Sequence, residues 1–275
     1  MSVDNPDSPE SAAAEDGDVP VAGTGEVKIR IEDVMKRFGR VIALDGVDLE
    51  IYENEVFALV GDNGAGKSTL MNIISGVFRQ TEGTVSLDDE PIDFSNPSDA
   101  RERGVETVYQ DLALMNDLDI ATNIFMGQFP TRGAGPLEFI DWDETYDRAA
   151  EIVHDRLGRE EMDLRTEVQF LSGGQRQLVA VARTLAFDPD VIVLDEPTSA
   201  LSVDASRLVH RVIDRLQEAG ITVVIVSHSI EDVLQIADRI GVLYQGSVAE
   251  VTTPDDADLE TLTNLMTTGS RRETI

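Results

Sequence analysis

The sequence contains no cysteine among its 275 residues, so disulfide bonds and thiolate metal sites are both excluded. Its wholly apolar runs, such as Val56–Val60 and Val223–Val226, are far too short to span a lipid bilayer. The stretch Met1–Gly25 has no basic residue and lacks the apolar core of a secretion signal. These absences predict a protein that stays in the cytoplasm.

Lysine is almost missing as well, since it occurs only at Lys28, Lys36 and Lys67. The chain has 53 Asp and Glu residues against 22 Lys and Arg residues, which gives a formal net charge of −31. A surface of this sign repels nucleic acids and anionic lipids, so neither is expected as a direct partner. The acidic residues are spread along the whole chain. This spread and the shortage of lysine favour adaptation to a salt-rich cytosol over an ordinary acidic protein with acidic ends.

The apolar residues indicate an α/β fold. Hydrophobic residues make up 41% of the chain, enough for one sizeable core or two closely joined subdomains. Val191–Leu194 and Thr222–Val226 are short β-branched runs, typical of parallel strands that are covered on both faces. Lys67–Phe78 and Asp204–Ala219 carry their apolar residues at helical spacing. Strands that alternate with helices predict an open, mostly parallel sheet.

The ends of the chain differ in composition from its centre. Residues 1–25 are rich in Asp, Glu, Pro, Ser, Ala and Gly, which predicts a disordered acidic tail. Residues 253–275 are acidic and rich in threonine, and we expect a second, loosely attached tail. The folded part should then cover residues 26–252. Within it, residues from about 111 to 188 lack strong strand signals and predict a helical insertion.

The segment GDNGAGKST, Gly61–Thr69, fits the phosphate-binding pattern G-x-x-x-x-G-K-[ST]. Its glycines let backbone N–H groups face phosphate oxygens, while Lys67 brings a positive charge and Ser68 a hydroxyl ligand for Mg²⁺. A glycine-rich turn without a ligand is disfavoured, because a predicted strand precedes the motif and a predicted helix follows it. No N-K-x-D guanine motif is present, which argues against a GTPase. The predicted nucleotide contacts are Gly61, Asn63, Gly64, Ala65, Gly66, Lys67, Ser68 and Thr69.

The segment VIVLDEPTSALS, Val191–Ser202, places two acidic residues directly after a buried strand. Asp195 is predicted to hold Mg²⁺, directly or through water, and Glu196 to position or deprotonate the attacking water. By itself, such a pair could be a solvated strand end. Its presence in one chain with the phosphate-binding loop favours a hydrolytic site.

A second anion-binding pattern lies in LSGGQRQ, Leu171–Gln177, where a serine and two glycines open a predicted amphipathic helix. Backbone N–H groups, a hydroxyl and the positive end of a helix dipole together attract phosphate.

With GDNGAGKST, LSGGQRQ and VIVLDEPTSAL in this order, the chain resembles the nucleotide-binding subunit of an ABC transporter from about Val27 to Glu250. The resemblance implies a P-loop NTPase core with a mostly parallel sheet, an antiparallel β portion near the N-terminus and an inserted α-helical subdomain. It also implies ATP and Mg²⁺ as cofactors and a second cassette, most simply in a homodimer, whose nucleotide is contacted by Ser172, Gly173, Gly174 and Gln175.

Further residues are matched to the family one at a time. Gln110, in VYQD, resembles the glutamine that approaches Mg²⁺ and the γ-phosphate, and His228, in VIVSHS, the histidine that contacts the γ-phosphate. Phe38, in KRFG, stands where the family stacks an aromatic ring on adenine, although a core phenylalanine is the alternative. Ser202 replaces the commoner aspartate of the family, which leaves the dimer contacts of that aspartate open.

The chain contains one cassette and no membrane-spanning stretch. This favours a transporter ATPase bound to integral-membrane permease subunits at the cytoplasmic face of the membrane. ABC ATPases that act on ribosomes usually have two cassettes and basic linkers. Those that act on DNA have a long coiled coil, for which the interval between the P-loop and LSGGQ leaves no room.

Two longer segments indicate the type of transporter. GDNGAGKSTLMNIISGVFRQTEGTV and FSNPSDARERGVETVYQDLALMNDLDIATNIFMGQ resemble the single-cassette ATPases of carbohydrate-uptake importers, of the ribose, xylose or fructose type. In such importers a permease and a solute-binding protein select the sugar. The alternatives are an amino-acid importer and a lipid exporter.

Overall fold

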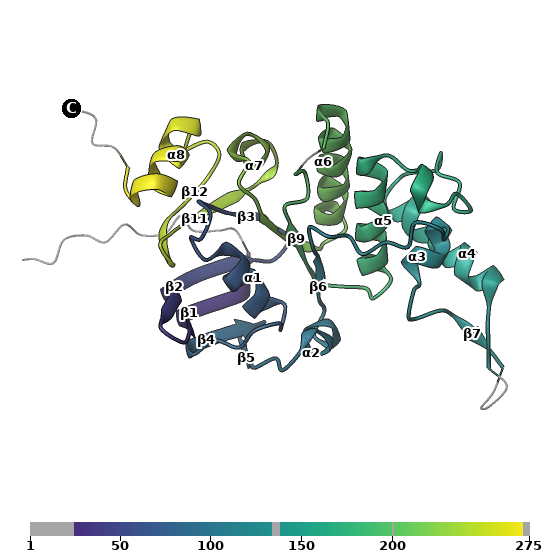
Figure 1. Ribbon diagram of the computed structural model, residues 1–275, viewed down its shortest axis with the longest axis horizontal. Helices are drawn as coiled ribbons and strands as arrows, with labels where there is room; N and C mark the ends of the chain where they lie inside the picture. Colours follow the sequence, from purple (N-terminus) through teal and green to yellow (C-terminus); the bar gives the residue numbers. More distant parts are fainter. Residues whose placement is uncertain (1–24, 134–137, 200, 272–275) are drawn as a thin grey trace, which may run out of the picture.

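The computed structural model describes residues 25–133, 138–199 and 201–271, so the predicted N-terminal tail lies almost wholly outside the described residues. A six-stranded sheet with the order β12-β11-β3-β10-β9-β6 forms its centre (Figure 1). Neighbouring strands are parallel except for the edge strand β12, which runs antiparallel to β11. The strands are β3 (Val56–Gly61), β6 (Val105–Val108), β9 (Val191–Asp195), β10 (Thr222–Val226), β11 (Arg239–Tyr244) and β12 (Ser247–Thr252).

The central strands are covered on both faces, as their apolar sequences predict. In β9, Val191 and Val193 belong to the hydrophobic core on one face, whereas Ile192 and Leu194 belong to the core on the other. This alternation follows from the two-residue period of a strand. The prediction of a mostly parallel α/β sheet is therefore confirmed.

A second, four-stranded sheet has the order β2-β1-β4-β5 and is antiparallel throughout. Its strands are β1 (Val27–Phe38), β2 (Val41–Tyr52), β4 (Glu82–Leu87) and β5 (Glu90–Ile92). Ile29 and Leu44 of this sheet share a core with Leu70 of helix α1 (Lys67–Ile74) and Val193 of β9. The antiparallel portion near the N-terminus is thus confirmed, and α1 lies between the two sheets (Figure 1).

Helix α1 is shorter than the predicted Lys67–Phe78 because the chain turns after Ile74. The Ser75 hydroxyl donates to the carbonyl of Met71, and Gly76 follows with φ of 73°, in the left-handed region. A Cβ at Gly76 would lie 2.7 Å from the carbonyl oxygen of Asn96, so close packing and backbone conformation both require glycine. Helix α2 (Pro97–Glu102) precedes β6 in the chain, and helices α6 (Val203–Glu218) and α7 (Ile230–Ile236) follow β9.

Between β6 and β9 the chain is mainly helical, and these helices lie at one end of the molecule (Figure 1). A two-stranded hairpin, which was not predicted, interrupts them. Helix α5 packs on α6, and Leu178 and Val212 share a core with Ile192 of the central sheet. The elements are α3 (Ile120–Ile124), β7 (Thr131–Arg132), β8 (Phe139–Ile140), α4 (Trp142–Ala150), a π-helical turn (Glu151–Arg156), a 3₁₀ turn (Val168–Phe170) and α5 (Gly173–Leu185).

The prediction of a loosely attached C-terminal tail is wrong for helix α8 (Leu259–Thr268). Leu262 and Leu265, three residues apart and therefore on one helical face, are buried with Val233 of α7 and Val242 of β11. Figure 1 shows α8 beside β11 and β12. The few apolar residues of this segment are enough to hold it because Leu262, Leu265 and the partly buried Met266 pack into the same core.

Candidate active site

A cavity of about 550 Å³ opens beside the carboxyl ends of the parallel strands. The phosphate-binding loop joins β3 to α1, Gln110 follows β6, Asp195 ends β9, and His228 follows β10. Ligands bind at this edge of open α/β sheets because the chain turns away from the sheet there and leaves a crevice. The lining residues are Phe38, Val41, Ile42, Ala43, Asn63, Gly64, Gly66, Lys67, Ser68, Thr69, Gln110, Asp195, Glu196, Val226 and His228.

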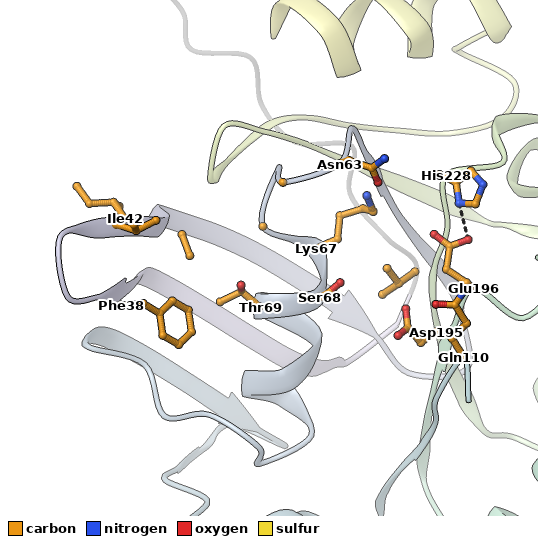
Figure 2. Close-up of a pocket in the computed structure, with 15 residues that line it drawn as sticks. Phe38, Ile42, Asn63, Lys67, Ser68, Thr69, Gln110, Asp195, Glu196 and His228 are labelled. Atoms are coloured by element: carbon orange, nitrogen blue, oxygen red, sulfur yellow. Dashed lines mark ion pairs between the residues drawn. The ribbon is translucent and has the colours of Figure 1, made fainter. Parts of the chain in front are cut away.

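The cavity has an apolar side and a polar side (Figure 2). Phe38 and Ile42 lie on one side, Gln110, Asp195, Glu196 and His228 lie on the other, and the side chains of Lys67 and Ser68 lie between them. Ile42 and its neighbour Val41 also line the cavity and were not predicted from the sequence. They are 51% and 64% exposed, which is unusual for β-branched residues in a strand. In the sequence, the signal that could have identified them is a pair of adjacent β-branched residues shortly after Phe38, at the start of β2.

The Lys67 side chain lies back on its own loop. Its Nζ donates to the carbonyl oxygens of Gly61, at 2.7 Å, and Asp62, at 3.2 Å. Burial lowers the pKa of Lys67, against the opposing effect of the nearby carboxylates of Glu196, Asp62 and Asp195. The ammonium group is thus held by two carbonyls that an incoming anion could replace.

Gly66 allows α1 to begin at the floor of the cavity. Its φ of 111° is in the left-handed region, and an added Cβ would lie 2.7 Å from the carbonyl oxygen of Ala43. A larger residue at this position would be strained and would also push the loop away from β2.

The two acidic residues Asp195 and Glu196 differ in backbone conformation. Glu196 has φ of 52°, and its N–H donates to the carbonyl oxygen of Val226 at 2.8 Å. This conformation turns Glu196 away from the line of β9, and its Oε2 lies 2.6 Å from Nδ1 of His228. Burial raises the pKa of Asp195 above its usual value, and the charge of Glu196 raises it further, while Lys67 lowers it. Two carboxylates with different environments therefore face one cavity.

The donor set on the polar side suits a hard divalent cation. The Ser68 hydroxyl, the Gln110 side chain and the Asp195 carboxylate all line the cavity, and Gln110 Nε2 lies 3.5 Å from the Ser199 hydroxyl. Among the described residues there is no group of three or more His, Cys, Asp or Glu side chains that could hold a metal on its own. Mg²⁺ commonly binds through one or two carboxylates and completes its shell with water and substrate phosphates. The residues present fit that mode of binding.

The LSGGQ residues lie outside this cavity, at the start of α5. The Ser172 hydroxyl accepts from the N–H of Gln175, and the Gln175 side chain accepts from the N–H of Ser172, so the two residues form a capping box. A Cβ at Gly174 would lie 3.1 Å from Cβ of Ala205 in α6. Close packing of α5 on α6 therefore favours glycine at this position of the motif, a role that was not predicted from the sequence.

The structure brings most of the predicted residues together. Phe38, Gln110, Asp195, Glu196 and His228 all line the cavity. In the phosphate-binding loop, Asn63, Gly64, Gly66, Lys67, Ser68 and Thr69 line it, whereas Gly61 and Ala65 do not. An added Cβ at Gly61 would lie 2.4 Å from the carbonyl oxygen of Leu243, so this glycine allows the loop to approach β11.

Comparison with known proteins identifies the family. The model of the ABC transporter family matches residues 44–199, which is more than half of the chain. The chain belongs to the ABC transporter family.

Two relatives are each 42% identical to this cassette. One is the xylose/arabinose import ATP-binding protein XylG of Sulfolobus acidocaldarius, with 87% of this chain and 93% of the relative covered. The other is the fructose import ATP-binding protein FrcA of Rhizobium meliloti, with 85% and 91% covered. The solved dimeric structure of MJ0796, a bacterial ABC transporter cassette, is 31% identical, with a TM-score of 0.67 and coverage of 82% and 98%. The fold predicted from the sequence is thus that of solved cassettes.

Within the residues that the structure describes, no helix is both long and apolar enough to cross a membrane.

Proposed function

We propose that this cassette is the ATP-hydrolysing subunit of a membrane importer, and that the importer takes up a sugar. The observation that carries the proposal is that the phosphate-binding loop and the Glu196–His228 pair line the same cavity. The sugar is supported by two relatives whose names state xylose/arabinose and fructose import.

The apolar and polar sides of the cavity support one direction for bound ATP. The adenine ring packs on the apolar side, against Phe38 and the exposed side chains of Val41 and Ile42. The triphosphate then passes the loop toward the polar side. Lys67 exchanges the carbonyls of Gly61 and Asp62 for phosphate oxygens, which suits a cation whose present partners are neutral. This orientation matches apolar surface with the base and charged groups with the phosphates.

On the polar side, Glu196 accepts a proton from the attacking water or orients that water. His228 fixes one oxygen of Glu196 through Nδ1, and its Nε2 is then available to the γ-phosphate. Ser68, Gln110 and Asp195 would hold Mg²⁺, which neutralises charge on the phosphates when it is bound. The positions of these residues around one cavity support these roles.

A second cassette supplies the rest of the site in this proposal. Ser172, Gly173, Gly174 and Gln175 start a helix outside the cavity of their own chain, so they serve the nucleotide of the partner in a homodimer. The dimeric form of the MJ0796 cassette supports this arrangement. The dimer acts at the cytoplasmic face of the membrane on permease subunits, and indirectly with a solute-binding protein. With a net charge of −31, no nucleic acid is involved.

The hydrolytic role is tested with Glu196→Gln. The variant should bind MgATP, turn it over at least about a hundredfold more slowly, and accumulate as an ATP-bound dimer. Glu231→Gln, which removes the charge of an exposed glutamate at the start of α7, is the matched control and should turn over normally. Equal ATPase rates in the Glu196 variant and the unmodified protein would exclude Glu196 as the group that activates water.

The solute class is tested by deletion of the protein in its host, followed by uptake of labelled compounds. Loss of uptake of one pentose or ketohexose, with amino-acid uptake retained, is the expected result. The reverse pattern would favour an amino-acid importer, and loss of neither would favour an exporter.

We also propose that the acidic surface adapts this cassette to a salt-rich cytosol. The formal charge of −31 and the presence of only three lysines support this proposal. At ~1 M salt the screening length is ~3 Å, so repulsion between surface carboxylates is confined to direct neighbours.

A further inference from the structure

Asp232, on α7, contacts two segments that are distant in sequence. Its Oδ2 accepts a hydrogen bond of 2.8 Å from the Thr198 hydroxyl, and its Oδ1 lies 3.5 Å from Nε2 of His210 on α6. Thr198 is only 8% exposed and the His210 side chain only 12% exposed. A carboxylate thus joins the loop after β9, helix α6 and helix α7 in a largely buried position.

Two of the contacting residues are close in sequence to the members of the Glu196–His228 pair. Thr198 is two residues after Glu196, and the turn between them is closed by the N–H of Ser199, which donates to the carbonyl oxygen of Glu196. Asp232 is four residues after His228, and its own N–H donates to the Ser229 hydroxyl at the start of α7. The Thr198–Asp232 hydrogen bond therefore closes a ring that contains both members of the pair.

The geometry of the Glu196–His228 pair needs further contacts to hold it, because neither residue is fixed by its own backbone or packing. Glu196 has a left-handed backbone conformation, which a non-glycine residue adopts only when its surroundings hold it there. The side chain of His228 is 63% exposed, so packing does not fix its ring. The Thr198–Asp232 bond is partly buried and its acceptor is a carboxylate, and a hydrogen bond to a charged group is among the stronger ones.

We propose that Thr198 and Asp232 are positioning residues for hydrolysis, which hold Glu196 and His228 at their 2.6 Å separation. This inference rests on the proposed function, because it gives Glu196 and His228 the roles stated there. His210 lies beside the carboxylate on the side of α6. Its Nε2 is buried without a hydrogen-bond partner, and the Asp232 carboxylate is the group that faces it. Because α6 also packs on α5, the helix that begins with the LSGGQ residues, Asp232 connects both halves of the proposed site.

The test compares substitutions that remove or keep the Thr198 hydroxyl at nearly constant volume. Thr198→Val should lower kcat about ten- to a hundredfold and leave KM for ATP within about twofold, because misplacement of a reacting group affects the transition state more than the ground state. Thr198→Ser keeps the hydroxyl and should retain most of the activity. In the Glu196→Gln background, Thr198→Val should cause a much smaller loss, since one of the two groups that it positions is already replaced.

The matched control is Thr145→Val. The Thr145 hydroxyl is also buried and also makes one short hydrogen bond, of 2.7 Å to the carbonyl oxygen of Asp141, but it lies in α4. It should lower the melting temperature in the same way as Thr198→Val and leave kcat unchanged. Asp232→Ala should lower kcat as Thr198→Val does, and the double variant should be no worse than Asp232→Ala alone.

Three results would overturn the inference: normal kcat in Thr198→Val, an equal loss of kcat in Thr145→Val, or an undiminished loss when Thr198→Val is added to Glu196→Gln. Failure of the proposed function is distinguishable, because Glu196→Gln alone would then turn over ATP at the normal rate.

Discussion

Ser172 has two roles that substitution can separate. In the free chain its hydroxyl caps α5 by accepting from the N–H of Gln175. In the proposed dimer the same hydroxyl faces the phosphates of the partner's nucleotide. Loss of a serine N-cap costs about 1 kcal/mol, within a range of about 0.5 to 2 kcal/mol. For a chain of this size that corresponds to a melting temperature lower by roughly 2–4 °C.

Ser172→Ala should therefore melt at a lower temperature even without nucleotide. Ser172→Asp should not, because aspartate is as good an N-cap as serine and its charge favours a helix N-terminus. Toward ATP the order reverses. An aspartate beside a phosphate adds a repulsion of about 4 kcal/mol at 4 Å and an effective dielectric constant of ~20, whereas alanine only removes one hydroxyl. Each of the two sites of the homodimer contains this repulsion, so ATP-dependent dimerisation should fall by at least about a thousandfold in Ser172→Asp, and much less in Ser172→Ala.

The assay measures melting without nucleotide, and ATP-dependent dimerisation by sedimentation in the slow Glu196→Gln background. Asn96→Ala is the matched control, since Asn96 caps α2 by accepting from the N–H groups of Ser98 and Asp99 and does not line the cavity. It should melt earlier and dimerise normally. If Ser172→Asp melted as early as Ser172→Ala, the capping argument would be wrong. If it dimerised as well as the unmodified cassette, the serine would not face phosphate.

Three further predictions concern pH, the C-terminal helix and salt. Burial raises the pKa of Asp195, so ionisation of this group opposes folding above that pKa. Asp195→Asn should therefore raise the melting temperature of the Mg²⁺-free protein at pH 7. The gain should vanish below the ordinary aspartate pKa of 3.8, where the protonated aspartate and the asparagine are both neutral. A gain that does not depend on pH would show that it does not come from ionisation of Asp195. Leu262→Ala, which removes a fully buried side chain of α8, should destabilise the cassette by about 2–5 kcal/mol in urea unfolding, whereas a loss below about 0.5 kcal/mol would mean that α8 is not part of the core. Lowering KCl from ~1 M to ~0.1 M lengthens screening from ~3 Å to ~10 Å and should lower the melting temperature, and a constant melting temperature would contradict halophilic adaptation.

The sequence by itself determined the parts of this protein that depend on local backbone patterns. The phosphate-binding loop could be predicted because its glycines, Lys67 and Ser68 act within one strand–turn–helix unit. Asp195 and Glu196 could be predicted because the apolar run of β9 marks where the strand ends. The short β-branched runs predicted parallel strands, since only strands covered on both faces are apolar at every position.

Tertiary structure alone decided the features that depend on residues far apart in the chain. The left-handed conformation of Glu196 turns it toward His228, and no local pattern shows that turn. Val41 and Ile42 became lining residues only because α1 packs between the two sheets and brings the phosphate-binding loop to β2. Helix α8 has too few apolar residues to stand out in sequence. It is held because β11 and α7 present a complementary apolar surface to Leu262, and such a surface exists only after the chain has folded.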